Sequence, residues 1–294
     1  MARRRGSMVG AMALGALVAT AVPAAQAATP GCEREAAPAP LERVTVNGEQ
    51  RTLLTVVPES YTPDRAHALV LAFHGRTNSH DRVRRYYDLE PHAGDDVIFV
   101  YPGGRQLPDG TYTWADPEDP TRSQPDLDLF DALVEAIGAR YCIDGERIFA
   151  VGHSLGGWYA NTLGCARGEV LRAIASLGGT ITRTECQGAT AALLLHNPDD
   201  RLVPFRYGLE ARNVFLDQNQ LPRRSDPLEL GRFECQHFGA EADDAPVLWC
   251  PHRENYTPSG RYYPHQWPRG TGEAIIDFLS TLAPAATTTA DAGG

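Results

Sequence analysis

The chain has 294 residues, of which 43% are hydrophobic and 22% charged, a composition typical of a globular protein with a large core. Its formal net charge of -10 argues against a nucleic acid or an anionic membrane as partner, because binding phosphate requires a positive surface. All 27 basic residues are arginine, and the lack of lysine excludes Schiff-base chemistry and any catalytic lysine.

The N-terminal stretch has the three parts of a secretory signal peptide. Residues 3–5 are basic, an apolar run extends from about residue 8 to residue 22, and Ala25-Gln26-Ala27 is a small-x-small cleavage site. We expect residues 1–27 to be removed and the mature protein to be secreted. A retained membrane anchor is the competing interpretation, but glycines interrupt the run, which falls short of the roughly 18 apolar residues of a span.

The mature chain is expected to form one domain between two short ends. Residues 28–40 are a lead rich in proline and alanine, with Cys32 as its expected anchor, and residues 284–294 are small and polar, typical of a disordered tail. No repeat or long linker divides the part between them. We therefore assign residues 41–283 to a single domain and expect a monomer.

Strand-like and helix-like segments alternate along this domain. Alternating apolar residues around Asn47-Gly48 predict an antiparallel hairpin over residues 43–58. Short apolar runs predict buried strands, and they read ALVLAFHG, DVIFVYPG, RIFAVGHS, AIASLGG and ALLLHN. Helical spacing of apolar residues predicts a helix in DLDLFDALVEAIGARYC, with Asp126 or Asp128 as its cap, and a last helix in GEAIIDFLSTL. The fold class is therefore α/β, a doubly wound and mostly parallel sheet with an N-terminal antiparallel hairpin.

Six cysteines in an exported protein favour disulfides over a metal site. They are Cys32, Cys142, Cys165, Cys186, Cys235 and Cys250, far apart and without a C-x-x-C pair. The segment GAEADDAPV between Cys235 and Cys250 resembles a hairpin turn, so these two are expected to face each other and pair. The pairing of the other four stays open.

Gly152-His153-Ser154-Leu155-Gly156 matches the pattern G-x-S-x-G of a serine nucleophile. The match is short, and a glycine-rich turn whose serine only caps a helix is the alternative. Here the motif follows the strand RIFAV and precedes the helix-like GGWYANTLGCA, which is the context that a nucleophile requires. We interpret Ser154 as a nucleophile and His153 as packed away from its oxygen.

A serine nucleophile needs a histidine base and a carboxylate that orients it, which α/β-hydrolases carry in the order serine, acid, histidine. Asp199 and Asp200 follow the strand ALLLHN, and Asp200 is preferred, although either could be an ordinary loop aspartate. Of the later histidines, only His265 lies just ahead of the last helix. His237 and His252, near the cysteine-flanked hairpin, are interpreted as surface residues.

An oxyanion hole completes such a site. Its first donor is expected to be the N–H of Leu155 at the start of the helix. The second should come from the loop after ALVLAFHG, from Arg76 or Thr77, while His74 is interpreted as a residue that fixes this loop.

The chain resembles the secreted feruloyl esterase and polyhydroxybutyrate depolymerase family of α/β-hydrolases. The resemblance lies in AFHGRTN, DVIFVYPGG, the Trp114 region, RYCIDGERIFAVGHSLGG, HNPDDRLVPF and PHQWP, in this order, and extends from about Cys32 to Leu282. It implies an α/β-hydrolase fold and catalysis by Ser154, Asp200 and His265. The cysteines also fall at places similar to those of the cysteine-rich feruloyl esterases. GHSLGG and PHQWP depart from the family's usual sequences, which affects the shape of the acyl pocket.

We therefore predict a secreted serine esterase that needs no metal or organic cofactor. Feruloyl or similar hydroxycinnamoyl esters of plant polysaccharide are the preferred substrates, with Trp114, Tyr263 and Trp267 as aromatic contacts, although core packing is the alternative for these side chains. Polyhydroxybutyrate and acetyl-xylan or short-chain esters remain alternatives. A secreted acyltransferase and a non-catalytic binding module of the same fold are more distant ones.

Overall fold

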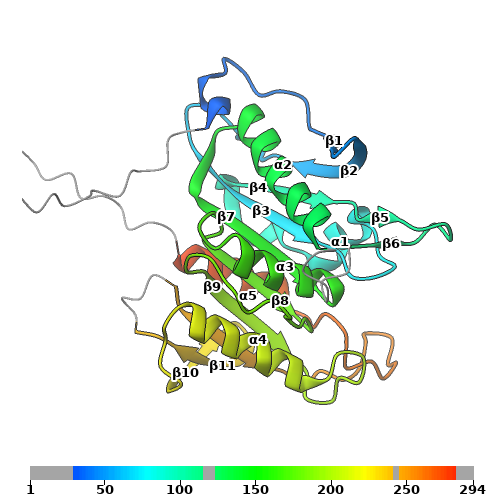
Figure 1. Ribbon diagram of the computed structural model, residues 1–294, viewed down its shortest axis with the longest axis vertical. Coiled ribbons are helices and arrows are strands. Elements are labelled where there is room, and N and C mark those ends of the chain that lie inside the picture. The colour runs from blue at the N-terminus through cyan, green and yellow to red at the C-terminus, as the bar shows by residue number, and fades with distance from the viewer. Residues whose placement is uncertain (1–28, 115–122, 241–244, 283–294) are drawn as a thin grey trace, which may run out of the picture.

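The computed structural model describes residues 29–114, 123–240 and 245–282 (Figure 1). The expected signal peptide, residues 1–27, and the expected tail, residues 284–294, lie outside these ranges. The described part of the expected lead is held on the domain by two links just after helix α2, Gln124–Arg140. One is the Cys32–Cys142 disulfide, and the other is the hydrogen bond from the Thr29 hydroxyl to the Tyr141 carbonyl oxygen (3.0 Å).

Ten strands form one sheet through the centre of the molecule, in the order β1-β2-β4-β3-β7-β8-β9-β12-β11-β10. The strands are β1 Arg43–Val46, β2 Glu49–Val56, β3 His67–Phe73, β4 Val97–Pro102, β7 Ile143–His153, β8 Ala173–Leu177, β9 Ala191–His196, β10 Ser225–Leu230, β11 Phe233–Phe238 and β12 Val247–Pro251. The six strands from β4 to β12 in this order run parallel, and antiparallel strands flank them at both edges.

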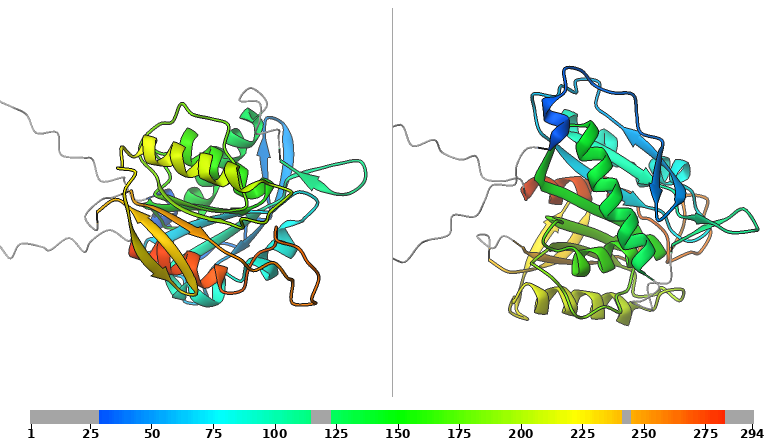
Figure 2. Two further views of the ribbon diagram at one scale, coloured as in Figure 1. Left: turned by 90° about the horizontal axis from the view of Figure 1, so that it is seen from below. Right: turned by 45° about the horizontal axis from the view of Figure 1, so that its top comes forward.

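Helices cover both faces of the sheet (Figure 2). They are α1 His80–Tyr87, α2 Gln124–Arg140, α3 Leu155–Ala166, α4 Phe205–Gln218 and α5 Thr271–Thr281. Alternate residues of β3 show the two layers: Leu69 and Leu71 pack with α2, α3 and α4 on one face, and Val70 and Ala72 pack with α1 and α5 on the other. Short elements complete the fold: η1 Pro30–Glu33, η2 Glu90–His92, η3 Gly94–Asp96 and the hairpin of β5 Arg105–Gln106 and β6 Tyr112–Thr113.

The expected hairpin turn lies at Asn47-Gly48, where both residues have positive φ (51° and 80°), the conformation that such turns need. The cap expected at Asp126 or Asp128 is wrong. Helix α2 begins earlier, at Gln124, so Asp126 lies within the first turn, is buried, and pairs with the buried Arg51 at 3.5 Å.

Three disulfides stabilise the fold: Cys32–Cys142, Cys165–Cys186 and Cys235–Cys250. The last is the pair expected from the sequence. Strands β11 and β12 are antiparallel with Gln236 opposite Trp249, which sets Cys235 and Cys250 opposite each other one position further along.

Candidate active site

Ser154 stands at the sharp turn between the end of β7 and the start of α3. Its φ of 58° and ψ of -124° are strained for a residue with a side chain. The turn is possible because Gly152 and Gly156 have no β carbon: one at Gly152 would overlap the Gly156 carbonyl, and one at Gly156 would overlap the Phe73 carbonyl of β3. The serine is left partly exposed at the carboxyl edge of the sheet.

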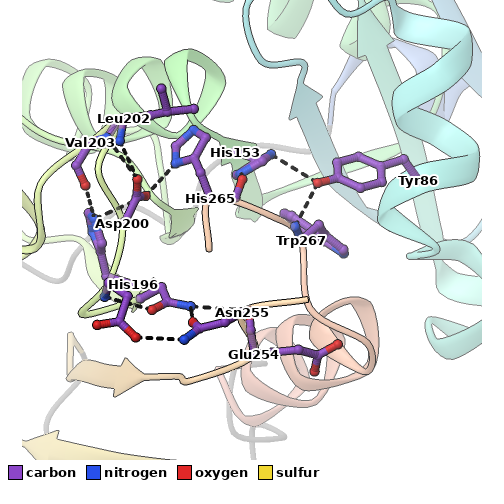
Figure 3. Close-up of polar contacts among 12 residues, drawn as sticks. Tyr86, His153, His196, Asp200, Leu202, Val203, Glu254, Asn255, His265 and Trp267 are labelled. Carbon is purple, nitrogen blue, oxygen red and sulfur yellow. Dashed lines mark hydrogen bonds and ion pairs between the residues drawn. The ribbon is translucent and has the colours of Figure 1, made fainter. Parts of the chain in front are cut away.

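Asp200 and His265 form a hydrogen-bonded pair at the same edge (Figure 3). The Nδ1–H of His265 donates to Oδ2 of Asp200 over 2.5 Å, and both side chains are buried. The other carboxylate oxygen of Asp200 accepts the N–H groups of Leu202 (2.8 Å) and Val203 (3.0 Å). Burial alone would raise the pKa of Asp200, but the hydrogen bond and charge of His265 and these two N–H groups together lower it. The carboxylate is therefore ionised, and by accepting the Nδ1–H it favours the tautomer of the neutral His265 ring that has its lone pair on Nε2.

The end of β8 brings the serine and the histidine together. The N–H of Ser154 donates to the Leu177 carbonyl oxygen over 2.9 Å. One residue further, a β carbon on Gly178 would lie 3.1 Å from Cε1 of His265, so only glycine leaves the ring its normal space. Ser154, Asp200 and His265 thus gather where β7, β8 and β9 end, as the sequence analysis expected of a doubly wound sheet.

Asp199, the competing acid, points to another partner. Its Oδ2 accepts the side-chain amide of Asn255 over 2.7 Å, and its own side chain is exposed. The geometry therefore pairs His265 with Asp200 and leaves Asp199 to hold the loop that carries Asn255.

The loop after β3 offers one of the two expected second donors of an oxyanion hole. The Thr77 N–H donates to the Tyr112 carbonyl oxygen over 3.0 Å. The expectation that Thr77 could supply the second oxyanion donor is therefore wrong, because its N–H is already bonded. Within the described residues the Arg76 N–H has no backbone acceptor. The Leu155 N–H lies at the first position of α3, where helix geometry supplies no partner.

Trp114 is buried against the loop after β3, so the expectation that it contacts the substrate is wrong. Its side chain is only 3% exposed, and its indole N–H donates to the His74 carbonyl oxygen over 2.6 Å. The His74 ring accepts the Gly104 N–H at Nε2 and donates from Nδ1 to the Gly75 carbonyl oxygen, both over 2.8 Å. Burial lowers the pKa of His74 to about 4, so the ring is neutral and fixes the loop, as expected.

His153 holds the backbone of the histidine loop, which is the segment between β12 and α5 that carries His265. This role was not expected from the sequence. Its Nε2–H donates to the His265 carbonyl oxygen over 3.0 Å, and its Nδ1 faces the Tyr86 hydroxyl at 3.3 Å. The Tyr86 oxygen in turn accepts the Trp267 N–H over 2.8 Å (Figure 3). Burial, with the nearby charge of His265, lowers the pKa of His153 to about 3. The neutral His153 ring therefore links Tyr86 to His265, and the Tyr86 hydroxyl itself bonds to Trp267.

Trp267 and Tyr263 both border the histidine loop. The Trp267 ring is stacked on Tyr87 with centroids 4.0 Å apart and planes 10° apart, and it is half-buried. The Tyr263 ring is half-buried and stands perpendicular to the His265 ring at 6.1 Å. Their contact with a substrate stays a prediction. Tyr86, which no sequence motif marked, lies beside Trp267 and His153, with its ring centroid 5.8 Å from each of theirs.

His252 lies inside the molecule, so its interpretation as a surface residue is wrong. It follows the buried strand β12, its N–H donates to the His196 carbonyl oxygen over 3.0 Å, and it is only 6% exposed. Neither ring nitrogen has a partner within the described residues. Burial, with the charge of His196 as a second cause, lowers its pKa to about 4.

Known proteins resemble the chain over most of its length. It is 31% identical over 215 residues to a probable feruloyl esterase C of Aspergillus terreus, covering 70% of this chain and 73% of the relative. It is 30% identical over 269 residues to feruloyl esterase C of Emericella nidulans, covering 88% and 89%. The chain belongs to the feruloyl esterase C family. As a member of the feruloyl esterases it is a carboxylic ester hydrolase. No protein-family model matches the chain.

Solved structures with the same fold are more distant in sequence. A Bacillus cereus carboxylesterase superposes with a TM-score of 0.56 at 14% identity, covering 79% of this chain and 94% of that one. An acetyl xylan esterase from Aspergillus awamori gives 0.55 at 11% identity, with coverages of 79% and 94%. These likenesses establish the α/β-hydrolase fold. Within the described residues, no helix is long and apolar enough to cross a membrane.

Proposed function

We propose that this feruloyl esterase acts through Ser154, His265 and Asp200. The observation that carries the proposal is the buried 2.5 Å hydrogen bond between Asp200 and His265 beside the strained turn of Ser154. Because Nδ1 of His265 donates to the carboxylate, Nε2 keeps its lone pair and can take the serine proton. Metal ions and organic cofactors have no part in these steps.

The reaction proceeds in two halves. Oγ of Ser154 attacks the ester carbonyl carbon, its proton passes to Nε2 of His265, and the carbon–oxygen bond of the leaving alcohol breaks as Nε2 returns the proton to that alcohol. Water then attacks the acyl-enzyme by the same route and releases the free acid. The N–H groups of Leu155 and Arg76 stabilise the oxyanion of both tetrahedral intermediates, and each such donor lowers the barrier by about 3 to 4 kcal/mol.

Hydroxycinnamoyl esters of plant cell-wall polysaccharide are the proposed substrates. The support is family membership, since the relatives at 30% and 31% identity are named feruloyl esterases. Half-buried Trp267 and Tyr263 beside His265 offer aromatic surface near the bond that is cleaved.

We also propose that the protein is secreted after removal of residues 1–27. Three disulfides and no free cysteine among the described residues fit an oxidising compartment. The described chain is anchored from Thr29 onward, because the Thr29 hydroxyl accepts the Ile143 N–H over 2.9 Å. Cleavage after Ala27 would therefore leave these contacts of Thr29 in place.

A panel of three esters tests the proposal on the mature protein. Methyl ferulate, p-nitrophenyl acetate and amorphous polyhydroxybutyrate are offered to the wild type and to Ser154→Ala, and released acid is measured. We expect ferulate release by the wild type and a loss of at least about 10³-fold in Ser154→Ala. Equal turnover by the two proteins would show that Ser154 is not the nucleophile. Polymer clearing without ferulate release reverses the substrate assignment, and transfer of ferulate to an added alcohol in preference to water indicates an acyltransferase.

A further inference from the structure

A groove of about 720 Å³ lies along the histidine loop, and Tyr263 and Trp267 are among the residues that line it. The loop between β12 and α5 forms one wall, and the C-terminal part of α1 with the residues that follow forms the other. The side chains that matter here are Arg85, Tyr86, Arg261, Tyr263, Trp267 and Arg269. The Tyr263 ring contacts the His265 ring at 6.1 Å, so the groove lies within one side chain of the reacting atoms. Its volume is in the range of ligand sites, about 300 to 1,000 Å³.

Aromatic rings are exposed at this groove and next to it. Tyr86 is 36% exposed although its hydroxyl is held by two hydrogen bonds. Tyr256 and Tyr262, on the same loop as Tyr263, are 60% and 49% exposed. Such rings give an apolar face against which the C–H face of a sugar ring can pack, with hydroxyl groups at the rim. In a polysaccharide ester the sugar chain is the alcohol side of the cleaved bond. It is this chain that would extend from the active site into the groove.

The same groove is rich in unpaired positive charge. Arg85, Arg261 and Arg269 are exposed, and none has a carboxylate oxygen within 4.0 Å among the described residues. Arg261 instead lies over the Tyr263 ring, with its guanidinium carbon 4.8 Å from the ring centroid, within the roughly 6 Å of a cation–π contact. The facing acid, Asp88, is 3.7 Å from His92. Three guanidinium groups without an acidic partner among the described residues therefore line this groove, in a chain of net charge -10.

We propose that the groove binds the carbohydrate part of the ester and that its arginines select chains bearing uronate carboxylates. Guanidinium groups bind carboxylates with two parallel hydrogen bonds, a geometry that neutral sugars cannot offer. Tyr86 and Trp267 then pack against the sugar rings while Arg261 and Arg269 bind the acidic groups. This inference rests on the proposed function, because it takes the groove to hold the alcohol side of a hydroxycinnamoyl ester.

Binding of two tetrasaccharides to the mature Ser154→Ala protein tests the selection without turnover. Calorimetry at low salt compares tetragalacturonate, which carries a carboxylate on every ring, with neutral xylotetraose. We expect tetragalacturonate to bind at least about tenfold more tightly, and its affinity to fall as salt is added. Equal affinities, or an acidic preference that salt does not weaken, overturn the proposal.

Single substitutions locate the binding. Arg261→Gln and Arg269→Gln should each weaken tetragalacturonate binding by about tenfold. The matched control is Arg223→Gln, which removes the same charge from an exposed arginine that is paired with Asp217 and does not line the groove. An equal loss in the control means that net charge alone acts, and this overturns the proposal.

Methyl ferulate separates the two proposals, because it has no sugar. Turnover of methyl ferulate by the wild type without discrimination between the tetrasaccharides removes the groove proposal alone. Discrimination that depends on Arg261 and Arg269, without any turnover of methyl ferulate, leaves the groove proposal and removes the proposed hydroxycinnamoyl substrate.

Discussion

His153 and Tyr86 act on the histidine loop through its backbone. One holds the carbonyl of His265, the other the N–H of Trp267, and the two side chains bond to each other. His265, the proposed base, is thereby held from both ends of a three-residue stretch, while Asp200 holds its ring. Both are positioning residues, because the hydrogen bonds of their side chains go to backbone atoms of this loop and to each other.

Tyr86→Phe is expected to lower kcat by roughly 5- to 30-fold while leaving KM for methyl ferulate within about twofold. The change removes one hydroxyl and leaves His153 Nδ1 and the Trp267 N–H without their partner, which costs about 1 to 2 kcal/mol of alignment. Steady-state kinetics far below the melting temperature measure the effect. His153→Ala should behave alike, and His153→Gln, which keeps an N–H donor, should recover part of kcat. An unchanged kcat with only a lower melting temperature would mean that the pair is merely structural.

The two neighbouring aspartates should differ widely in their effect on rate. Asp200→Asn is expected to lower kcat by about 10³- to 10⁴-fold, because an amide in place of the carboxylate favours the wrong tautomer of His265. Asp199→Asn should stay within about threefold, since Asp199 bonds to Asn255 and not to the histidine. Kinetics with methyl ferulate on both variants make the comparison, and the reverse order would identify Asp199 as the acid.

At the scale of elements, the buried parallel strands from β3 to β9 and the N-terminal hairpin were predictable, whereas strand β10 and helix α1 were not. The expected runs for β3, β4, β7, β8 and β9 are continuous apolar stretches, because parallel strands between two helix layers are buried on both faces. Strand β10 has one neighbour only and is mostly exposed, so Ser225–Leu230 carries a proline and two acidic residues and no apolar pattern. Helix α1, over His80–Tyr87, is likewise largely charged, with only Val83 and Tyr87 buried.

Disulfide removal should affect stability according to the length of chain that each bond closes. Cys32–Cys142 spans 110 residues and Cys235–Cys250 spans 15. By loop entropy the first contributes about 4.8 kcal/mol and the second about 3 kcal/mol. We expect the double alanine variant at Cys32 and Cys142 to lose more unfolding free energy in urea than the one at Cys235 and Cys250. Equal losses would show that the lead adds little constraint to the unfolded chain.

For the molecule as a whole, chain order predicted the catalytic candidates better than their surroundings. Serine, acid and histidine each follow a strand or precede a helix, and these positions share one edge of the sheet in any fold of this class. The neighbours of the site depend on packing between distant segments. Trp114 is buried under the loop of His74, and His252 is enclosed next to β9, neither of which a local pattern reveals.

Buried neutral histidines should make stability depend on pH over a defined range. Burial lowers the pKa of His74 to about 4, of His153 to about 3 and of His252 to about 4, from an ordinary value of 6.5. The unfolded chain therefore binds more protons than the folded chain below pH 6.5. Their contribution to stability is full above pH 6.5 and is lost as pH falls toward 4 and 3. The lowered pKa of Asp200 adds a further loss only at lower pH, where carboxylates protonate.

The unfolding free energy in urea is expected to fall by up to about 1.4 kcal/mol per pH unit for each of these histidines between pH 6 and pH 4. His252→Leu should reduce this slope, because it removes one of the buried histidines that take up a proton on unfolding. The same variant should be more stable at pH 7, since the His252 ring nitrogens are buried without partners among the described residues and leucine has no polar group to desolvate. Urea titrations of both proteins at several pH values measure both effects. An unchanged slope together with lower stability at pH 7 would mean that His252 is bonded in solution, and its lowered pKa would then need another cause.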